Sequence, residues 1–200
     1  MSNPLLLAFI VFAAVMYLTP GPNNIMVLSS GLTYGFRPTI PHIAGITFGC
    51  AFMVAAVGLG LGTIFATYPV LQTILKYAGA AYLVYLAAMI ALSEPVAPGE
   101  DDGRRPMTFW GAVMFQWVNV KGWVMVIGSI TAYAGIASFP WNIAIQVVLC
   151  LLLGVVSTSI WTLSGSSLRS LMTSQRSVRA FNIVMAALLL ASLFPVFMEA

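Results

Sequence analysis

Two polar stretches, half a chain apart, contain the residue types best suited to bind a small charged molecule. The first reads Thr19-Pro20-Gly21-Pro22-Asn23-Asn24. Its two prolines lack the N–H that a continuous helix requires, so the backbone carbonyls freed here must be met by protein or line a wet cavity. Asn23 and Asn24 follow at the start of a second half-helix, where an Asn can act as a cap and the positive dipole end favours a carboxylate. We therefore predict a substrate cavity here. The alternative is a proline kink that only shapes packing.

The second stretch centres on a lysine inside an apolar segment. It reads Gln116-Trp117-Val118-Asn119-Val120-Lys121-Gly122-Trp123. A charge at mid-bilayer costs about 2.5–3.5 kcal/mol on insertion scales, so Lys121 needs a partner. No Asp or Glu lies centrally in an apolar segment, which favours a substrate carboxylate or the freed carbonyls of the first stretch over an acidic side chain. The alternatives are a structural lysine bonded to carbonyls and a lysine at a helix end.

The composition indicates that these stretches lie within a membrane. Of the 200 residues, 60% are hydrophobic and only 6% are charged, whereas a soluble domain has about 25% charged residues. There is too little polar surface to cover a water-facing globule, so nearly all of the chain must face the lipid bilayer or other membrane-embedded protein. A soluble enzyme and a disordered linker are excluded. The net charge of +3 is spread singly and in pairs, which argues against a nucleic-acid partner.

The apolar segments predict an all-α integral membrane protein with six transmembrane helices. A helical crossing takes about 20 apolar residues, and the charged and proline-rich breaks leave six such segments, at roughly 4–33, 42–67, 70–92, 109–135, 141–166 and 178–198. The first and fourth are long and interrupted. No connection is large enough to be a separate domain, so residues 1–200 are predicted to form a single transmembrane unit.

The two interrupted segments are related by position. A shift of 99 positions lays Met26-Val27 on Met125-Val126, Ser30 on Ser129 and Tyr34 on Tyr133. Each half then has three spans, and because three is odd the halves have inverted topology. We predict one repeat over about 1–92 and a second over about 109–200. Paired interrupted segments in matching positions of two halves point to the central site of a transporter.

Most basic residues fall at alternate connections between the segments. These are Arg37, Arg104, Arg105, Arg169, Arg176 and Arg179. The positive-inside rule places this side in the cytoplasm and both termini on the opposite side. Because no Lys or Arg precedes Arg37, the first segment lacks the basic start of a signal peptide, and we expect it to remain as a helix.

The cysteines and the lone histidine do not suggest a cofactor. Cys50 and Cys150 lie inside predicted spans without a C-x-x-C pattern and are expected to be small buried hydrophobes. No cluster of His, Cys or acidic residues suggests a metal or an organic cofactor. An intramembrane hydrolase is disfavoured because there is no H-E-x-x-H motif or paired membrane Asp.

Several motifs together resemble the LysE/RhtB family of bacterial amino-acid exporters. They are Thr19-Pro20-Gly21-Pro22-Asn23-Asn24, Gly35-Phe36-Arg37, the Gly45 and Gly49 pair, Gly79-Ala80-Ala81-Tyr82-Leu83, Phe115-Gln116, Asn119-Val120-Lys121 and Asn182-Ile183-Val184. They run from the first span to the sixth. One departure is Val120, since the wider family usually reads Asn-Pro-Lys; without that proline we expect the second break to be less severe than the first. The Q-x-V-N-V-K form, together with Pro22-Asn23-Asn24-Ile25, is similar to the cysteine/O-acetylserine exporter branch.

The resemblance implies a multi-pass protein of the bacterial inner membrane that is not an enzyme. In such a membrane the distribution of basic residues places both termini in the periplasm, and no residue cluster suggests a cofactor. It implies secondary-active export of small neutral amino acids or derivatives, with cysteine and O-acetylserine as leading substrates, threonine and homoserine as further ones, and the proton gradient as the driving force. A homodimer is left open. The site is expected to contain Thr19, Pro20, Gly21, Pro22, Asn23, Asn24, Gln116, Asn119 and Lys121. The alternatives are a thiol-redox transmembrane conduit, which needs Cys at the breaks, and a non-transporting membrane scaffold, which has no need of a buried lysine.

Overall fold

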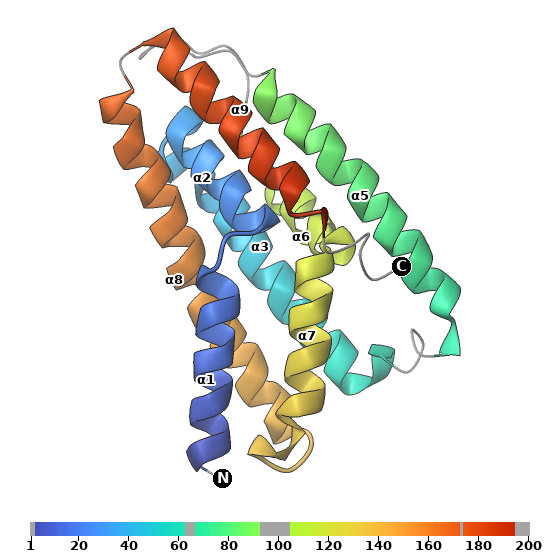
Figure 1. The fold of residues 1–200 in the computed structure, drawn as a ribbon. Coiled ribbons are helices and arrows are strands. Elements are labelled where there is room, and N and C mark those ends of the chain that lie inside the picture. The colour runs from blue at the N-terminus through green and yellow to red at the C-terminus, as the bar shows by residue number, and fades with distance from the viewer. Residues whose placement is uncertain (1–2, 63–66, 93–104, 173, 195–200) are drawn as a thin grey trace.

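The computed structural model describes residues 3–62, 67–92, 105–172 and 174–194, and every element in these ranges is helical. In chain order the elements are α1 (Asn3–Leu18), α2 (Pro22–Tyr34), α3 (Phe36–Ala56), a π-helical turn η1 (Val57–Leu61), α5 (Pro69–Ala91), α6 (Phe109–Val118), α7 (Val120–Ala132), a short 3₁₀ turn η2 (Ala134–Ile136), α8 (Trp141–Leu171) and α9 (Gln175–Ala191). Figure 1 shows them as one elongated bundle.

The helices confirm the all-α membrane architecture. Three segments are long and apolar enough to span a membrane, at Phe36–Leu61, Thr73–Ala91 and Trp141–Leu168, and the bent pairs α1–α2 and α6–α7 bring the number to five. The sixth predicted segment corresponds to α9, which has 17 residues. Its predicted end near 198 and most of the predicted 93–108 connection lie outside the described residues. The second span starts earlier than predicted, at Phe36, so Arg37 lies on the first turn of α3.

Local signals explain where several helices begin. Pro22 occupies the first position of α2, where the missing N–H costs nothing and the fixed φ suits a helix. Thr108 caps α6, and its hydroxyl oxygen accepts a hydrogen bond from the Gly111 N–H at 3.1 Å. Ser174 caps α9 in the same way, accepting from the Ser177 N–H.

The main helix contacts join the two halves of the chain. The second half of the first span, α2, packs along the fifth span, α8, while the first half of the fourth span, α6, packs along the second span, α3. The third and sixth spans, α5 and α9, also pack together, side by side in Figure 1. An exchange of the two predicted halves would turn the first two pairs into α7 on α3 and α1 on α8, and these helices pack together much less closely. The packing around the breaks is therefore not symmetric, whereas the α5–α9 pair is unchanged by the exchange. α2 is surrounded, with 10 of its 13 residues buried, as expected for a helix at the centre of a bundle.

Glycines bring the neighbouring helices close to α6. A Cβ at Gly45 would lie 2.3 Å from the Phe109 carbonyl oxygen, and one at Gly79 would lie 2.1 Å from the Val118 carbonyl oxygen. Only glycine fits such contacts, so these two glycines allow close helix packing. As a result, α6 is held tightly between α3 and α5, which fixes the position of the second break.

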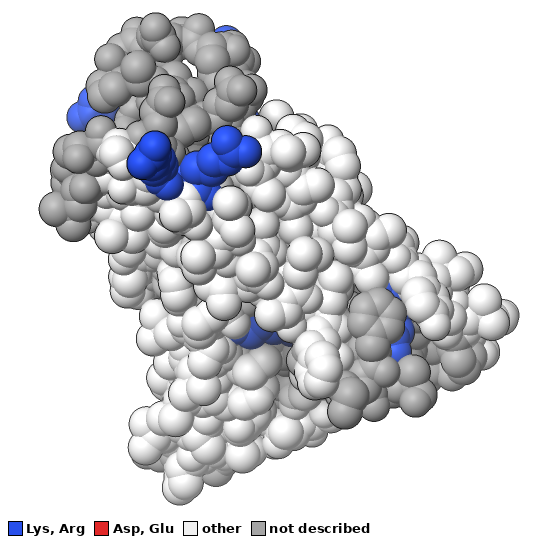
Figure 2. Space-filling view, turned by 45° about the horizontal axis from the view of Figure 1, so that its top comes forward, with Lys and Arg blue, Asp and Glu red and all other residues white. Residues whose placement is uncertain are grey.

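The charged residues within the described ranges are all basic, because the five acidic residues lie in 93–104 and 195–200. Figure 2 shows a face that is almost entirely uncharged, with basic side chains at a few places. Arg37 lies in the first turn of α3, Arg105 lies shortly before α6, and Arg176 and Arg179 lie near the start of α9. The topology brings these helix starts to one end of the bundle, which we call the arginine-rich end; the chain passes from α8 to α9 there, at the top of Figure 1.

Candidate substrate site

The first break is an extended segment stabilised by the half-helix that follows it. α1 and α2 are bent by 50°, and Gly21 precedes α2 with extended φ and ψ of −176° and 177°. The predicted capping of α2 by an Asn is wrong, because no side chain caps this helix. Instead, Asn24 reaches back, and its Nδ2 donates to the carbonyl oxygens of Tyr17 at 2.7 Å and Thr19 at 2.8 Å. The amide therefore satisfies the C-terminal end of α1.

The second break is shorter and sharper. α6 and α7 are bent by 69°, although only Asn119, with φ −83° and ψ 99°, leaves the helical conformation. The expectation that the loss of proline makes this break less severe is therefore wrong for the bend angle. The Trp123 indole N–H donates to the Trp117 carbonyl oxygen at 2.8 Å. The Trp123 indole thus provides a donor for a backbone carbonyl at the end of α6, as the Asn24 amide does at the end of α1.

Two side-chain contacts join the breaks to each other. Asn23 and Gln116 form a paired amide contact, with Asn23 Nδ2 donating to Gln116 Oε1 at 2.9 Å and Gln116 Nε2 donating to Asn23 Oδ1 at 3.2 Å. Lys121 Nζ donates to the Thr19 carbonyl oxygen at 2.8 Å, the Thr19 hydroxyl at 2.9 Å and the Pro20 carbonyl oxygen at 3.3 Å. The freed carbonyls of the first break are thus the partner of the lysine in the second.

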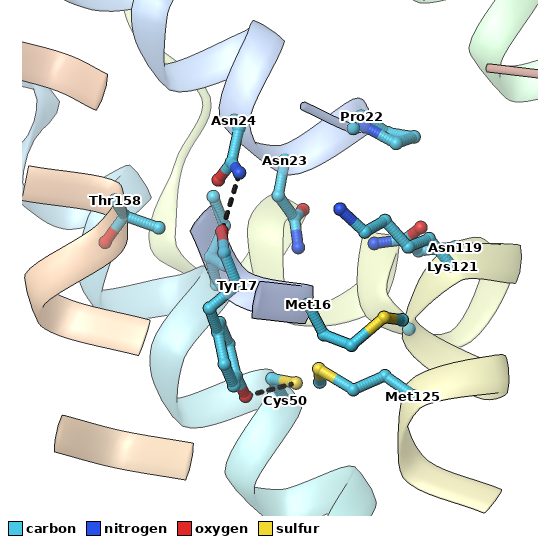
Figure 3. A pocket seen from close by; sticks show the side chains of 13 residues that line it. Met16, Tyr17, Pro22, Asn23, Asn24, Cys50, Asn119, Lys121, Met125 and Thr158 are labelled. Atoms are coloured by element: carbon cyan, nitrogen blue, oxygen red, sulfur yellow. Dashed lines mark hydrogen bonds between the residues drawn. The ribbon is translucent and has the colours of Figure 1, made fainter. Parts of the chain in front are cut away.

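A small pocket lies beside these contacts, with a cavity volume of about 40 Å³. Of the predicted residues, Gly21, Pro22, Asn23, Asn24, Asn119 and Lys121 line it. The other three residues do not line the pocket but are hydrogen-bonded to residues that do. Thr19 and Pro20 accept from Lys121, and Gln116 accepts from Asn23. The structure therefore brings all nine predicted residues together. In Figure 3, Asn23, Asn119 and Lys121 point toward a common space.

One acceptor at the pocket has no partner. Asn119 is 2% exposed, and its Oδ1 meets no donor within the described part of the chain. A buried amide oxygen without a donor is costly. Because Asn119 lines the pocket, a bound molecule with an N–H group would satisfy this oxygen.

The opposite wall of the pocket consists of residues that the sequence analysis missed. Met16, Tyr17, Ile46, Cys50, Met125 and Thr158 line it. In Figure 3, Met16, Cys50 and Met125 bring three sulfur atoms to this side. Apolar residues from α1, α3 and α7 have no sequence signal that separates lining from packing. The pocket therefore has one polar wall and one wall in which apolar and sulfur-containing side chains predominate.

The two cysteines share one tyrosine. The Tyr17 hydroxyl is hydrogen-bonded to Cys50 Sγ at 3.2 Å and also to Cys150 Sγ. Both thiols are free and buried, as predicted. Their common partner was not predicted, because their separation in sequence hides the approach of α3 to α8.

A larger cavity lies on the arginine-rich side of the pocket. It has a volume of about 410 Å³ and lies between α2 and α5, with Ser29, Thr33 and Arg105 among its lining residues. Cavities of about 300–1,000 Å³ are the size that takes small molecules. Within the described ranges, no group of His, Cys, Asp and Glu could hold a metal ion.

Comparison with known proteins connects this geometry to a transporter family. The model of a family described as LysE type translocator matches residues 14–194. A cysteine/O-acetylserine efflux protein of Escherichia coli strain K12 is 33% identical over 199 residues, covering 94% of this chain and 95% of that protein. Proteins of the same name from Escherichia coli O139:H28 (32% over 200 residues; 95% and 96% covered) and Shigella sonnei (33% over 199 residues; 94% and 95%) are also similar. No solved structure matches the chain. The chain belongs to the LysE type translocator family.

Proposed function

We propose that this amino-acid exporter carries cysteine, O-acetylserine and similarly small neutral amino acids out of the cytoplasm, with threonine and homoserine as further candidates. The protein is a transporter and not an enzyme, as its family membership shows. The observation that carries the substrate proposal is the Lys121 ammonium held by Thr19 and Pro20 beside the pocket. The printed names of the relatives support the choice of substrates.

The polar wall of the pocket suits a zwitterion. The substrate carboxylate meets either the N-terminus of α2, whose first N–H groups have no partner within the helix, or the Lys121 ammonium. The substrate ammonium meets the carbonyls freed at the first break, with Gln116 and Asn119 as further hydrogen-bond partners. The short side chain of cysteine or O-acetylserine then lies against the wall of Met16 and Met125.

The position of the larger cavity supports alternating access. We assign the arginine-rich end to the cytoplasm and both termini to the periplasm of a bacterial inner membrane. The cavity of about 410 Å³ then opens toward the side from which an exported substrate arrives. Rocking of residues 1–92 against residues 109–200 would carry the pocket to the other side.

We further propose that the proton gradient drives export and that Lys121 carries the proton. Within the described residues no carboxylate is present to do so, and Lys121 is the ionisable side chain that joins the two breaks. Export by Lys121→Met that keeps its dependence on the pH gradient would remove this proposal.

Amino-acid release tests the exporter proposal. Cells expressing the wild-type protein and, at matched membrane levels, Lys121→Ala are loaded with amino-acid mixtures, and the medium is analysed by mass spectrometry. We expect cysteine, O-acetylserine or another small neutral amino acid to accumulate only with the wild type. If the wild-type protein releases none of the amino acids into the medium, the proposed substrates are contradicted.

A further inference from the structure

Lys121 already occupies an ammonium-binding site within the protein. A primary ammonium has three N–H donors and no acceptor. Lys121 Nζ meets three oxygens, at 2.8, 2.9 and 3.3 Å, and all three belong to Thr19 and Pro20. We call these three oxygens the ammonium cage. The cage matches the number of donors on any R–NH₃⁺ group, including the α-ammonium of an amino acid.

The Lys121 side chain also takes the space in front of the cage. A Cβ at Gly21 would lie 2.7 Å from Lys121 Cδ and 3.0 Å from Lys121 Nζ, so the lysine lies directly across this glycine. The remaining pocket of about 40 Å³ holds a few water molecules at most, since one water needs roughly 10–15 Å³. The Lys121 ammonium therefore has to leave before a substrate ammonium can use all three oxygens.

We propose that Lys121 is a built-in occupant of the substrate's ammonium site, and that it is displaced by the α-ammonium and then paired with the carboxylate of the same substrate. The inference rests on the proposed function and adds the order of contacts. Before binding, the cage holds the Lys121 ammonium. After binding, it holds the substrate ammonium, and the displaced Lys121 finds an anion in the carboxylate that arrives with it.

This exchange makes Lys121 a specificity determinant for zwitterions. A simple amine would displace Lys121 without supplying an anion, and two cations would then share a pocket lined by Met16 and Met125. Two cations at close range repel each other. An α-amino acid avoids this cost because its carboxylate stays beside the lysine. The unpartnered Asn119 Oδ1 offers one more acceptor to either ammonium during the exchange.

The cage itself is tested by chemical rescue. Purified wild-type protein, Lys121→Ala and the control Lys76→Ala are heated with methylammonium, or with tetramethylammonium and sodium at equal ionic strength. Methylammonium fits the emptied cage, whereas tetramethylammonium has no N–H to donate. We expect methylammonium to raise the Tm of Lys121→Ala by about 2–4 °C and to leave the other two proteins unchanged. Equal shifts in all three proteins, or none in Lys121→Ala, would overturn the inference.

A second variant keeps the test informative if Lys121→Ala does not fold. The Gly21 backbone is extended, so Gly21→Ala is allowed by φ, but its Cβ pushes against the lysine without removing the charge. We expect methylammonium to stabilise Gly21→Ala as well, by a smaller shift. No response from this variant and none from Lys121→Ala would show that the cage does not bind an added ammonium.

Specificity provides the second readout. Cysteamine is cysteine without its carboxylate, so the pair isolates the role of the anion. We expect the wild type to bind cysteine at least about tenfold more tightly than cysteamine, and Lys121→Met to lose this preference because the cage is open to either amine. An unchanged preference in Lys121→Met would contradict the exchange.

The two proposals fail separately. If methylammonium stabilises Lys121→Ala but neither the wild type nor Lys76→Ala, while wild-type cells release no amino acid, the ammonium cage is supported and the proposed substrates are wrong. If amino acids are exported but methylammonium does not distinguish the variants, export stands and the displacement of Lys121 is wrong.

Discussion

The two broken spans solve the same structural problem with different residues. The α1–α2 break uses two prolines around Gly21 and bends by 50°, whereas the α6–α7 break uses one extended residue, Asn119, and bends by 69°. The proline-rich break exposes backbone oxygens. The proline-free break contributes polar side chains, Asn119 and Lys121. The halves therefore share an architecture but not a chemistry: one supplies acceptors, and the other supplies the cation that meets them.

This division explains why the symmetry of the sequence is incomplete at the breaks. The half-helices that follow, α2 and α7, have 13 residues each, whereas α1 has 16 residues and α6 has 10. Two identical breaks would supply either carbonyls alone or lysines alone. A zwitterion needs both, because its ammonium requires acceptors and its carboxylate requires a cation or N–H donors. The difference between the breaks is what allows one site to form between them.

The largest effect is expected from closing the first break. In a Pro20→Ala, Pro22→Ala double variant the helix can continue, so the carbonyls of Thr19 and Pro20 would bond within the helix instead of facing Lys121. We expect amino-acid export to fall at least about tenfold, the loss expected when a hydrogen bond to a charged group of about 1.5–3 kcal/mol disappears. The measurement is release from cells at matched membrane levels. Export at the wild-type rate would show that the break is not the site.

A smaller effect on stability is expected from the amide that supports the first break. Asn24→Ala removes hydrogen bonds to the Tyr17 and Thr19 carbonyls and should lower the free energy of unfolding by about 1–3 kcal/mol. Its counterpart at the second break is Trp123→Phe, which removes one bond to Trp117 and should cost about 1 kcal/mol. Thermal unfolding of both purified variants checks the order. A larger loss in Trp123→Phe would reverse our view of which break is more heavily supported.

A proline placed in the second break should be tolerated. Val120 is the first residue of α7, and Asn119 before it is extended, which is the geometry that proline and its predecessor favour. We expect Val120→Pro to raise stability by about 0.4–1 kcal/mol and to keep export. Tm and release measured on the same preparation give both results. Loss of stability would mean that the second break needs freedom at this position.

The smallest effect on export is expected from Cys150→Ala. The Cys150 thiol is hydrogen-bonded to the Tyr17 hydroxyl and does not line the pocket. A thiol-redox conduit needs an exchanging pair, so Cys150→Ala would abolish it, whereas an exporter should keep its rate. The control is the wild-type protein assayed for release under oxidising and reducing conditions. A strong loss of export in the variant would favour the redox alternative.

The sequence was sufficient for the spans and for the residues of the breaks, because proline, buried charge and apolar length act locally. It also identified the partner of Lys121 among a few alternatives, since no central acidic residue exists. It did not predict that Asn24 caps the preceding helix rather than its own, or that the second break bends more. Those outcomes depend on how α2, α6 and α8 pack, which no local pattern encodes. The sulfur-lined wall of Met16, Cys50 and Met125 was missed for the same reason.

Efflux from proteoliposomes tests the central claim most directly, namely that one amino-acid site forms between the oxygens of the first break and the lysine of the second. Vesicles loaded with an amino-acid mixture contain the wild type, Lys121→Met or the control Lys76→Met, and the released amino acids are followed by mass spectrometry. We predict rapid release of small neutral amino acids by the wild type and Lys76→Met, and a rate at least about tenfold lower for Lys121→Met. Release of the same amino acids at the same rate by Lys121→Met would place the site elsewhere in the protein.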